Sequence, residues 1–182
     1  TYNASIDNHM KSLFIPLEMS YKQVITRLME IHIKQRLMSV DDQSFSNSVW
    51  HDEEKLRKVI EDVTTNINVY NHLGSLTIEK LIGVLEYYVM AEGVNLIVLD
   101  HKDAAINSLT NDGSDVKLID NLMGELKRIA IQYNLTVLIV SHQSRNTNDK
   151  DDSKASLSRV RGSAGVAQNS DIVLGLERDR TT

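Results

Sequence analysis

Three polar residues capable of chemistry stand just past the apolar runs of this sequence: Glu18, Asp100 and His142. Asp100 directly follows the apolar run 96–99, and His142 comes two positions after the run 136–140. Runs of this kind are typical of strands buried on both faces of a parallel sheet. Such sheets bind ligands in the crevice outside the carboxyl ends of their strands. We therefore expect the three side chains to surround one ligand, and two such strand ends suggest a nucleotide.

Each of the three residues has a chemical interpretation and a simpler structural one. The Asp100 carboxylate can hold Mg²⁺, which prefers oxygen ligands, or it can cap the next turn. Glu18 can orient and deprotonate a water for attack on a phosphate, or it can interact with the dipole of the following helix. His142 can donate to a γ-phosphate oxygen or form an ordinary surface hydrogen bond. Convergence at one sheet edge favours the chemical interpretations.

The phosphate-binding half of such a site is not found in these residues. No G-x-x-x-x-G-K-[ST] motif occurs, and the one Lys-Ser pair, Lys11-Ser12, follows Met10 rather than a glycine. In P-loop proteins this motif supplies the backbone N–H groups and the lysine that hold the phosphates. We therefore expect that the 182 residues alone neither bind ATP tightly nor hydrolyse it.

Strand and helix patterns alternate along the chain. Short apolar runs predict strands at 13–17, 67–70, 96–100, 135–140 and 171–176. Apolar side chains at helical spacing predict helices after the capping box of Ser20 and Gln23, over 52–66, from Thr77 to Gly93 and over 116–132. This alternation implies an α/β fold with a mostly parallel sheet covered by helices on both faces.

Composition limits the class of protein. The 182 residues are 41% hydrophobic and 5% aromatic, which suits one domain with an aliphatic core. The sequence has no cysteine, which excludes disulfides and thiolate metal sites and favours a reducing compartment, for which we expect the cytoplasm. No apolar stretch approaches the roughly twenty residues of a membrane span, so we expect no membrane partner.

A net charge of −5 excludes a protein that is basic over its whole surface, so contact with nucleic acid would need a local basic segment. Residues 143–170 carry five basic and three acidic side chains, a local excess of +2. Residues 143–159 are almost devoid of apolar side chains, and we expect 144–154 to be the most mobile part of the chain. Such a loop can contact phosphates or can simply be solvated.

Four groups of residues follow one another in a characteristic order, namely Leu17-Glu18-Met19-Ser20, residues 96–101, residues 119–123 with 140–142, and residues 160–163 with 168–171 and 176–178. In these groups the chain resembles the helicase domain of ring-shaped replicative helicases of the DnaB type. The resemblance covers essentially the whole chain and looks closest to phage primase-helicases and their mitochondrial relative Twinkle. The resemblance implies that residues 1–182 are a partial RecA-like helicase ATPase domain without its Walker A strand.

The same resemblance implies roles for individual residues. Glu18 would be the water-activating base, Asp100 the Walker B ligand of Mg²⁺, and His142 the residue that senses the γ-phosphate. Gln168 would belong to the motif that links DNA to the nucleotide site. The residues that would bind DNA, chiefly through its phosphates, are Arg145, Lys150, Lys154, Arg161 and Gly162.

The implied function is that of a fragment of a replicative DNA helicase. Its homohexameric ring would use ATP or dTTP with Mg²⁺ to move along single-stranded DNA and unwind duplex, in the bacterial host cytoplasm if a phage encodes it. The alternatives are another RecA-like ATPase, such as a recombinase paralogue or a clock-type ATPase, and a non-catalytic RecA-like module that only binds partners.

Some features depart from the family pattern. The 182 residues lack the Walker A loop and the arginine finger, and Ala167 stands where phage relatives often carry a basic residue. Because the chain begins at Thr1 without an initiator Met, we expect an internal fragment. The missing Walker A strand would lie between the strands at 135–140 and 171–176. We expect residues upstream of Thr1 to supply this strand, rather than direct pairing of its two neighbours or filling of the slot by residues 1–10 or by another molecule.

Overall fold

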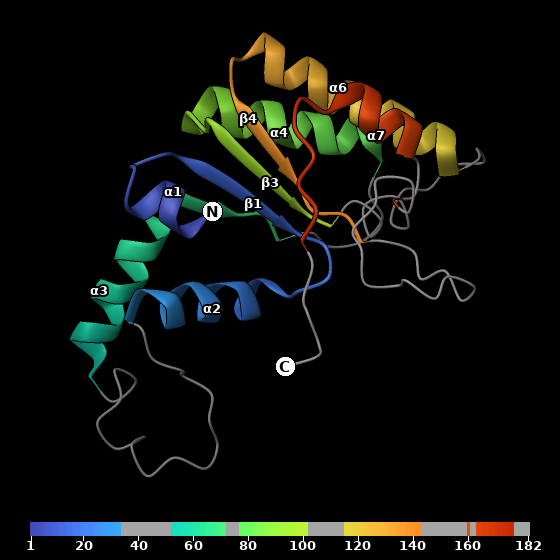
Figure 1. The fold of residues 1–182 in the computed structure, drawn as a ribbon. Coiled ribbons are helices and arrows are strands. Elements are labelled where there is room, and N and C mark those ends of the chain that lie inside the picture. Colours follow the sequence, from blue (N-terminus) through green and yellow to red (C-terminus); the bar gives the residue numbers. More distant parts are fainter. Residues whose placement is uncertain (34–51, 72–76, 102–114, 143–159, 161–162, 177–182) are drawn as a thin grey trace, which may run out of the picture.

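The computed structural model describes residues 1–33, 52–71, 77–101, 115–142, 160 and 163–176. At the centre of these residues is a four-stranded parallel sheet in the order β2-β1-β3-β4 (Figure 1). Its strands are β1 (Ser12–Pro16), β2 (Ile67–Val69), β3 (Leu96–Asp100) and β4 (Thr136–Ile139). The parallel α/β fold predicted from the alternating pattern is confirmed, and these four strands lie within one residue of their predicted ends.

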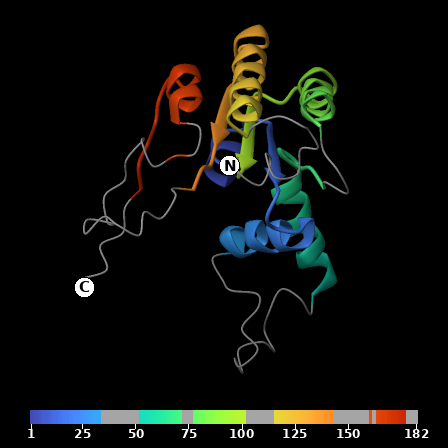
Figure 2. The ribbon, with the colours of Figure 1, turned by 90° about the vertical axis from the view of Figure 1, so that its right-hand side faces the viewer.

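Helices cover both faces of this sheet (Figure 2). One face carries α4 (Ile78–Glu92) and α6 (Asp115–Gln132), and the other carries α2 (Tyr21–Ile33) and α3 (Glu53–Thr64). The short helix α1 (Tyr2–Ile6) precedes β1, and α7 (Ser163–Asn169) packs against α6. The sequence patterns had not predicted α7.

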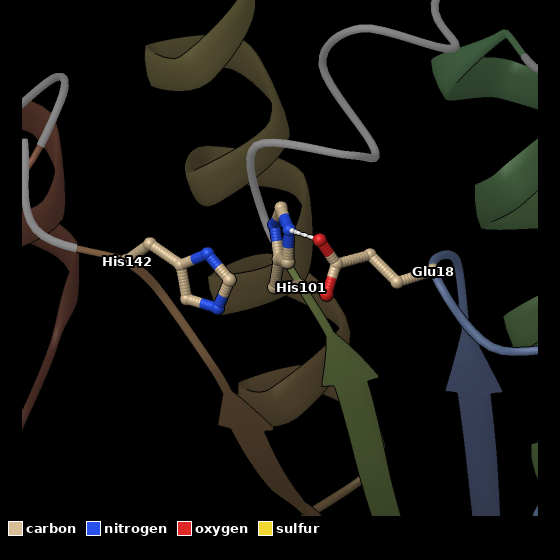
Figure 3. A group of neighbouring side chains, drawn as sticks. All are labelled: Glu18, His101 and His142. Atoms are coloured by element: carbon tan, nitrogen blue, oxygen red, sulfur yellow. Dashed lines mark ion pairs between the residues drawn. The ribbon is translucent and has the colours of Figure 1, made fainter.

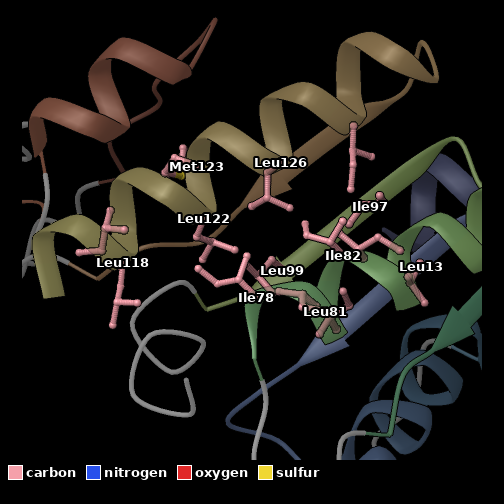
Figure 4. Packing of buried hydrophobic residues seen from close by; sticks show 14 of the residues in the cluster. Leu13, Ile78, Leu81, Ile82, Ile97, Leu99, Leu118, Leu122, Met123 and Leu126 are labelled. Atoms are coloured by element: carbon pink, nitrogen blue, oxygen red, sulfur yellow. The ribbon is translucent and has the colours of Figure 1, made fainter. Parts of the chain in front are cut away.

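The larger hydrophobic core lies between the sheet and the α4–α6 layer (Figure 4). Leu13 of β1 and Ile97 and Leu99 of β3 pack there against Leu81 and Leu122 of the helices. Each is at most 1% exposed. Burying a side chain of this size contributes about 1.5–3 kcal/mol, so this layer holds β1 and β3 rigidly beside each other.

A second, smaller core lies on the opposite face of the sheet. Val24, Leu28 and Met29 of α2 and Val63 of α3 are buried there, and Phe14 of β1 packs against them. Successive strand residues point to opposite faces of the sheet, so Leu13 packs into the larger core and Phe14 into the smaller one. This explains why the central strands are apolar without interruption.

The predicted helix caps are present. At the start of α2, the Ser20 N–H donates to Gln23 Oε1 at 2.8 Å, and the Gln23 N–H donates to Ser20 Oγ at 3.3 Å. The Thr77 hydroxyl accepts from the backbone N–H of Lys80 at the start of α4. Gly93 ends α4 with φ of 69°, a left-handed conformation that favours glycine. These contacts satisfy backbone groups that helix ends leave free.

The strand predicted at 171–176 is wrong, because these residues form no strand in the structure. They are exposed, with Ile172 at 78%, Leu174 at 81% and Leu176 at 95%. A strand needs a neighbour for its ladder, and within the described residues β4 pairs with β3 alone. The two segments that flank the expected slot therefore do not pair directly, and residues 2–6 form α1, which contacts α3 rather than β4.

No helix among the described residues has the length and apolar character that crossing a membrane requires.

Candidate functional site

The expected strand ends lie side by side at one edge of the sheet. Glu18 comes two residues after β1, Asp100 is the last residue of β3, and His142 comes three residues after β4. The ladder continues past the strands, since the Leu17 N–H donates to the Asp100 carbonyl at 2.7 Å and the Val140 N–H donates to the Leu99 carbonyl at 3.0 Å. These backbone bonds fix the relative positions of the three segments.

Glu18 is held by a histidine that follows β3. The Nε2 atom of His101 lies 2.7 Å from Oε1 of Glu18 (Figure 3). The His101 side chain is 8% exposed, whereas that of Glu18 is 53% exposed. The buried imidazole is therefore the fixed partner, and it orients a carboxylate that remains accessible to solvent.

His142 completes the group from the other side of His101. The two imidazole rings have centroids 4.1 Å apart and planes inclined by 44°. One ligand atom from each of Glu18, His101 and His142 lies within 4.8 Å of the other two. The ends of three adjacent segments thus bring a carboxylate and two imidazoles into one cluster, which we call the edge cluster (Figure 3).

The sequence patterns do not identify His101 as a site residue. They indicate Asp100 instead, although both residues follow the same apolar run. The available signal was a second titratable side chain at that strand end. The run alone could not reveal which neighbour contacts Glu18, because that depends on how the backbone leaves the sheet.

Asp100 and Gln168 lie outside the edge cluster. Asp100 is partly buried and is paired in register with Pro16 of β1, so it stands beside the cluster at the same sheet edge. Gln168 is exposed on α7, next to the exposed Ala167. Helix α7 packs closely against α6, with Gly165 next to Asp120.

The residues predicted to contact DNA, which are Arg145, Lys150, Lys154, Arg161 and Gly162, all lie outside the described residues. The same holds for the predicted mobility of residues 144–154. Their roles remain predictions from the sequence.

Comparison with known proteins identifies the class to which this fold and site belong. The family model for the DnaB-like helicase C terminal domain matches residues 1–182, so the chain belongs to that family. The resemblance to DnaB-type helicases is confirmed, and the family match favours them over the recombinase and clock-type alternatives.

Individual relatives agree with this assignment. The chain is 25% identical over 169 residues to a probable replicative DNA helicase of Trieres chinensis, covering 92% of this chain and 36% of that protein. It is 27% identical over 173 residues to the DNA helicase/primase of Enterobacteria phage T3, covering 90% of this chain and 29% of that protein. The chain therefore spans about a third of the length of these relatives.

Solved structures share the fold of this chain. A DnaB-like replicative helicase, whose structure was described together with its interactions with primase, aligns with a TM-score of 0.64 at 21% identity, over 91% of this chain and 40% of that one. A separate solved ATPase domain aligns with a TM-score of 0.67 at 21% identity, over 91% of this chain and 58% of that one. The RecA-like fold predicted from the sequence is thereby confirmed.

Proposed function

We propose that the protein containing this chain is a replicative DNA helicase, of the kind that phage helicase/primases represent. It couples the hydrolysis of ATP or dTTP to movement along single-stranded DNA and to duplex unwinding, as a homohexameric ring in the cytoplasm, which is that of the bacterial host if a phage encodes the protein. The observation that carries this proposal is the edge cluster, which stands at the ligand-binding edge of a parallel sheet in a member of the DnaB-like family.

Glu18 acts in this proposal as the general base. Its Oε1 accepts from the Nε2–H of His101, and its Oε2 is left to orient a water and take its proton. A carboxylate locked by a buried donor is held in one orientation, and fixed geometry is a large part of catalysis in phosphoryl transfer. His142, exposed at the same edge, donates to the γ-phosphate.

Asp100 is the residue that would hold Mg²⁺. A partly buried carboxylate at the carboxyl end of β3 fits a cation that takes one or two protein carboxylates and otherwise binds phosphate and water. When bound, the ion would neutralise charge on the phosphates. Gln168 would transmit nucleotide state towards DNA, and Arg145, Lys150, Lys154, Arg161 and Gly162 would contact the DNA backbone.

The test is Glu18→Gln in the full-length protein, with DNA-stimulated hydrolysis of ATP and of dTTP and duplex unwinding measured in parallel. We expect kcat to fall by about 10²–10⁴-fold with both nucleotides while single-strand binding is retained. The matched control is Glu53→Gln, which changes an exposed glutamate on α3.

Wild-type hydrolysis in Glu18→Gln would refute the assignment of the base. A full-length protein that binds partners but hydrolyses neither nucleotide would instead support the non-catalytic module.

A further inference from the structure

The edge cluster has a ligand composition unlike that of a magnesium site. Glu18 offers one carboxylate oxygen, and His101 and His142 each offer an imidazole nitrogen. Magnesium prefers oxygen ligands, whereas imidazole suits zinc, cobalt, nickel, copper and iron. Two histidines and one carboxylate form a common ligand set of zinc sites that keep an open coordination position.

The distances suit a cation of this kind. Zinc binds nitrogen and oxygen at about 2.0–2.2 Å, so tetrahedral ligands stand roughly 3.3–3.5 Å apart. In the edge cluster the Glu18–His101 pair is at 2.7 Å, and the three ligand atoms all lie within 4.8 Å of one another. The ligand atoms are therefore close enough for small side-chain rotations to complete three-point coordination.

Burial divides the cluster into one buried and two exposed ligands. The His101 side chain is 8% exposed, whereas that of Glu18 is 53% exposed and His142 lies at the surface. A cation that replaces the hydrogen bond between His101 and Glu18 releases the carboxylate, so the two outer side chains can then turn towards the cation without disturbing the core. Their exposure also gives a cation a route from solvent and leaves the fourth position open to water.

The other described residues offer weak competition for such a cation. The sequence contains no cysteine, so no thiolate competes for such a cation, and the histidine imidazoles are the strong ligands that suit it. Among the described residues, the edge cluster is the group of three ligating side chains that gathers in one place. A second histidine–carboxylate contact exists, with His32 Nε2 at 3.5 Å from Asp62 Oδ2.

We propose that Glu18, His101 and His142 bind one zinc-class divalent cation in the nucleotide-free protein, separately from the Mg²⁺ assigned to Asp100. A cation in this position occupies the carboxylate that would activate water and the imidazole that would meet the γ-phosphate. It would therefore inhibit hydrolysis. That consequence rests on the proposed function, whereas the binding itself does not.

The test titrates Co²⁺ and then Zn²⁺ into purified full-length protein without nucleotide. Visible absorption of Co²⁺ reports tetrahedral coordination, and calorimetry gives stoichiometry and affinity. We expect one such site per chain, with displacement of Co²⁺ by Zn²⁺. Glu18→Gln and His142→Gln should each weaken the affinity at least about tenfold, and His101→Gln should do the same.

The matched control is His32→Gln, which removes the histidine of the His32–Asp62 contact and should leave the cobalt spectrum unchanged. Because Glu18 and His142 are at the surface, their variants keep the test valid even if the buried His101 variant unfolds. The proposal would be overturned if Glu18→Gln and His142→Gln both bound Co²⁺ with the affinity of the wild type. It would also be overturned if the wild type bound Co²⁺ with a Kd above about 1 mM. Neither outcome depends on whether the protein hydrolyses nucleotide.

Discussion

His101 and Glu18 connect the ends of two neighbouring parallel strands through one contact, from Nε2 of the buried imidazole to Oε1 of the exposed carboxylate across 2.7 Å. The contact crosses from the end of β3 to the end of β1, whose backbones are already joined by the bond from Leu17 N–H to the Asp100 carbonyl. The orientation of Glu18 therefore depends on the sheet rather than on the flexibility of its own side chain.

From this contact we predict that His101 acts as a positioning residue for nucleotide hydrolysis. In the full-length protein, His101→Ala should lower kcat about tenfold or more with little change in KM, because the base would lose its orientation. His101→Gln, whose amide can still donate to Glu18, should restore part of the rate. Steady-state kinetics in metal-chelated buffer would measure both variants.

A double-mutant cycle checks that the two residues act together. In the Glu18→Gln background, His101→Ala should lower kcat far less than it does in the wild type. A residue that acts through Glu18 has no effect on kcat once the base is lost. Additive effects, or a change confined to KM, would contradict the positioning role.

The sequence patterns predicted most of the fold because they are local. Helical spacing and the capping box of Ser20 with Gln23 depend on residues close in the chain, and the structure shows both. The segment 171–176 was mispredicted for the opposite reason, since a strand requires a neighbour that local apolar character cannot supply. His101 escaped detection because its contact with Glu18 links positions 83 residues apart.

Replacing each of two glycines by alanine should change the free energy of unfolding in opposite directions. A Cβ at Gly165 would overlap Oδ1 of Asp120 on α6 and lie 3.0 Å from its Cγ and 3.4 Å from its Cα, so the Asp120 side chain would have to turn away or the two helices would have to move apart. We expect Gly165→Ala to lower the free energy of unfolding by about 1–3 kcal/mol. A Cβ at Gly124 in α6 meets nothing within 4 Å. Because alanine favours the helix more than glycine does, Gly124→Ala should raise the free energy of unfolding by about 0.5–1 kcal/mol.

Urea unfolding of the two glycine variants, compared at equal m values, measures both changes. If both variants shift the midpoint in the same direction, the close approach of α7 to α6 is not the determinant of the Gly165 effect.

The start of α3 should be sensitive to acid. The Asp52 carboxylate accepts from the Lys55 backbone N–H at 3.1 Å and pairs with its ammonium at 2.9 Å. The hydrogen bond with the Lys55 side chain is the main cause that lowers the pKa of Asp52. Because the folded pKa is below the unfolded one, this stabilisation is present above the unfolded value of about 3.9 and is lost as pH falls through the folded pKa.

Hydrogen exchange of the first turn of α3, followed from pH 6 to pH 3, would detect this loss. Asp52→Asn is the matched control, since asparagine caps helices equally well but does not titrate. An identical acid response in the wild type and in Asp52→Asn would contradict the assignment to Asp52.

The basic loop should determine the salt dependence of DNA binding. In the full-length protein, Lys150→Ala with Lys154→Ala should weaken single-strand binding and reduce the slope of log K against log salt by about 1.4, since each phosphate contact on a single strand contributes roughly 0.7. The matched control carries Lys58→Ala and Lys80→Ala, which remove the same charge from exposed positions on α3 and α4. Equal slopes in the two double variants would refute phosphate contact by the loop.

The last prediction concerns the outer edge of β4, which pairs with no strand among the described residues. The exposed apolar side chains of Ile172, Val173 and Leu174 and the half-exposed Leu138 of β4 lie on the two segments that flank the expected slot. An edge that leaves backbone N–H and C=O groups unpaired beside exposed apolar side chains is a ready template for pairing with a further strand. We expect an additional strand of the full-length protein, the Walker A strand of RecA-like sheets, to pair with β4 on one side and with 171–176 on the other.

Hydrogen exchange can detect this strand directly. The amides of Val173 and Leu174 should exchange at least about a hundredfold more slowly in the full-length protein than in a chain limited to residues 1–182, because ladder hydrogen bonds protect them. The amide of Ile97, in a strand already flanked by β1 and β4, is the internal control and should be protected in both. Fast exchange of Val173 and Leu174 in the full-length protein, with Ile97 protected, would show that no strand occupies the slot and that the exposed apolar segment is stabilised in some other way.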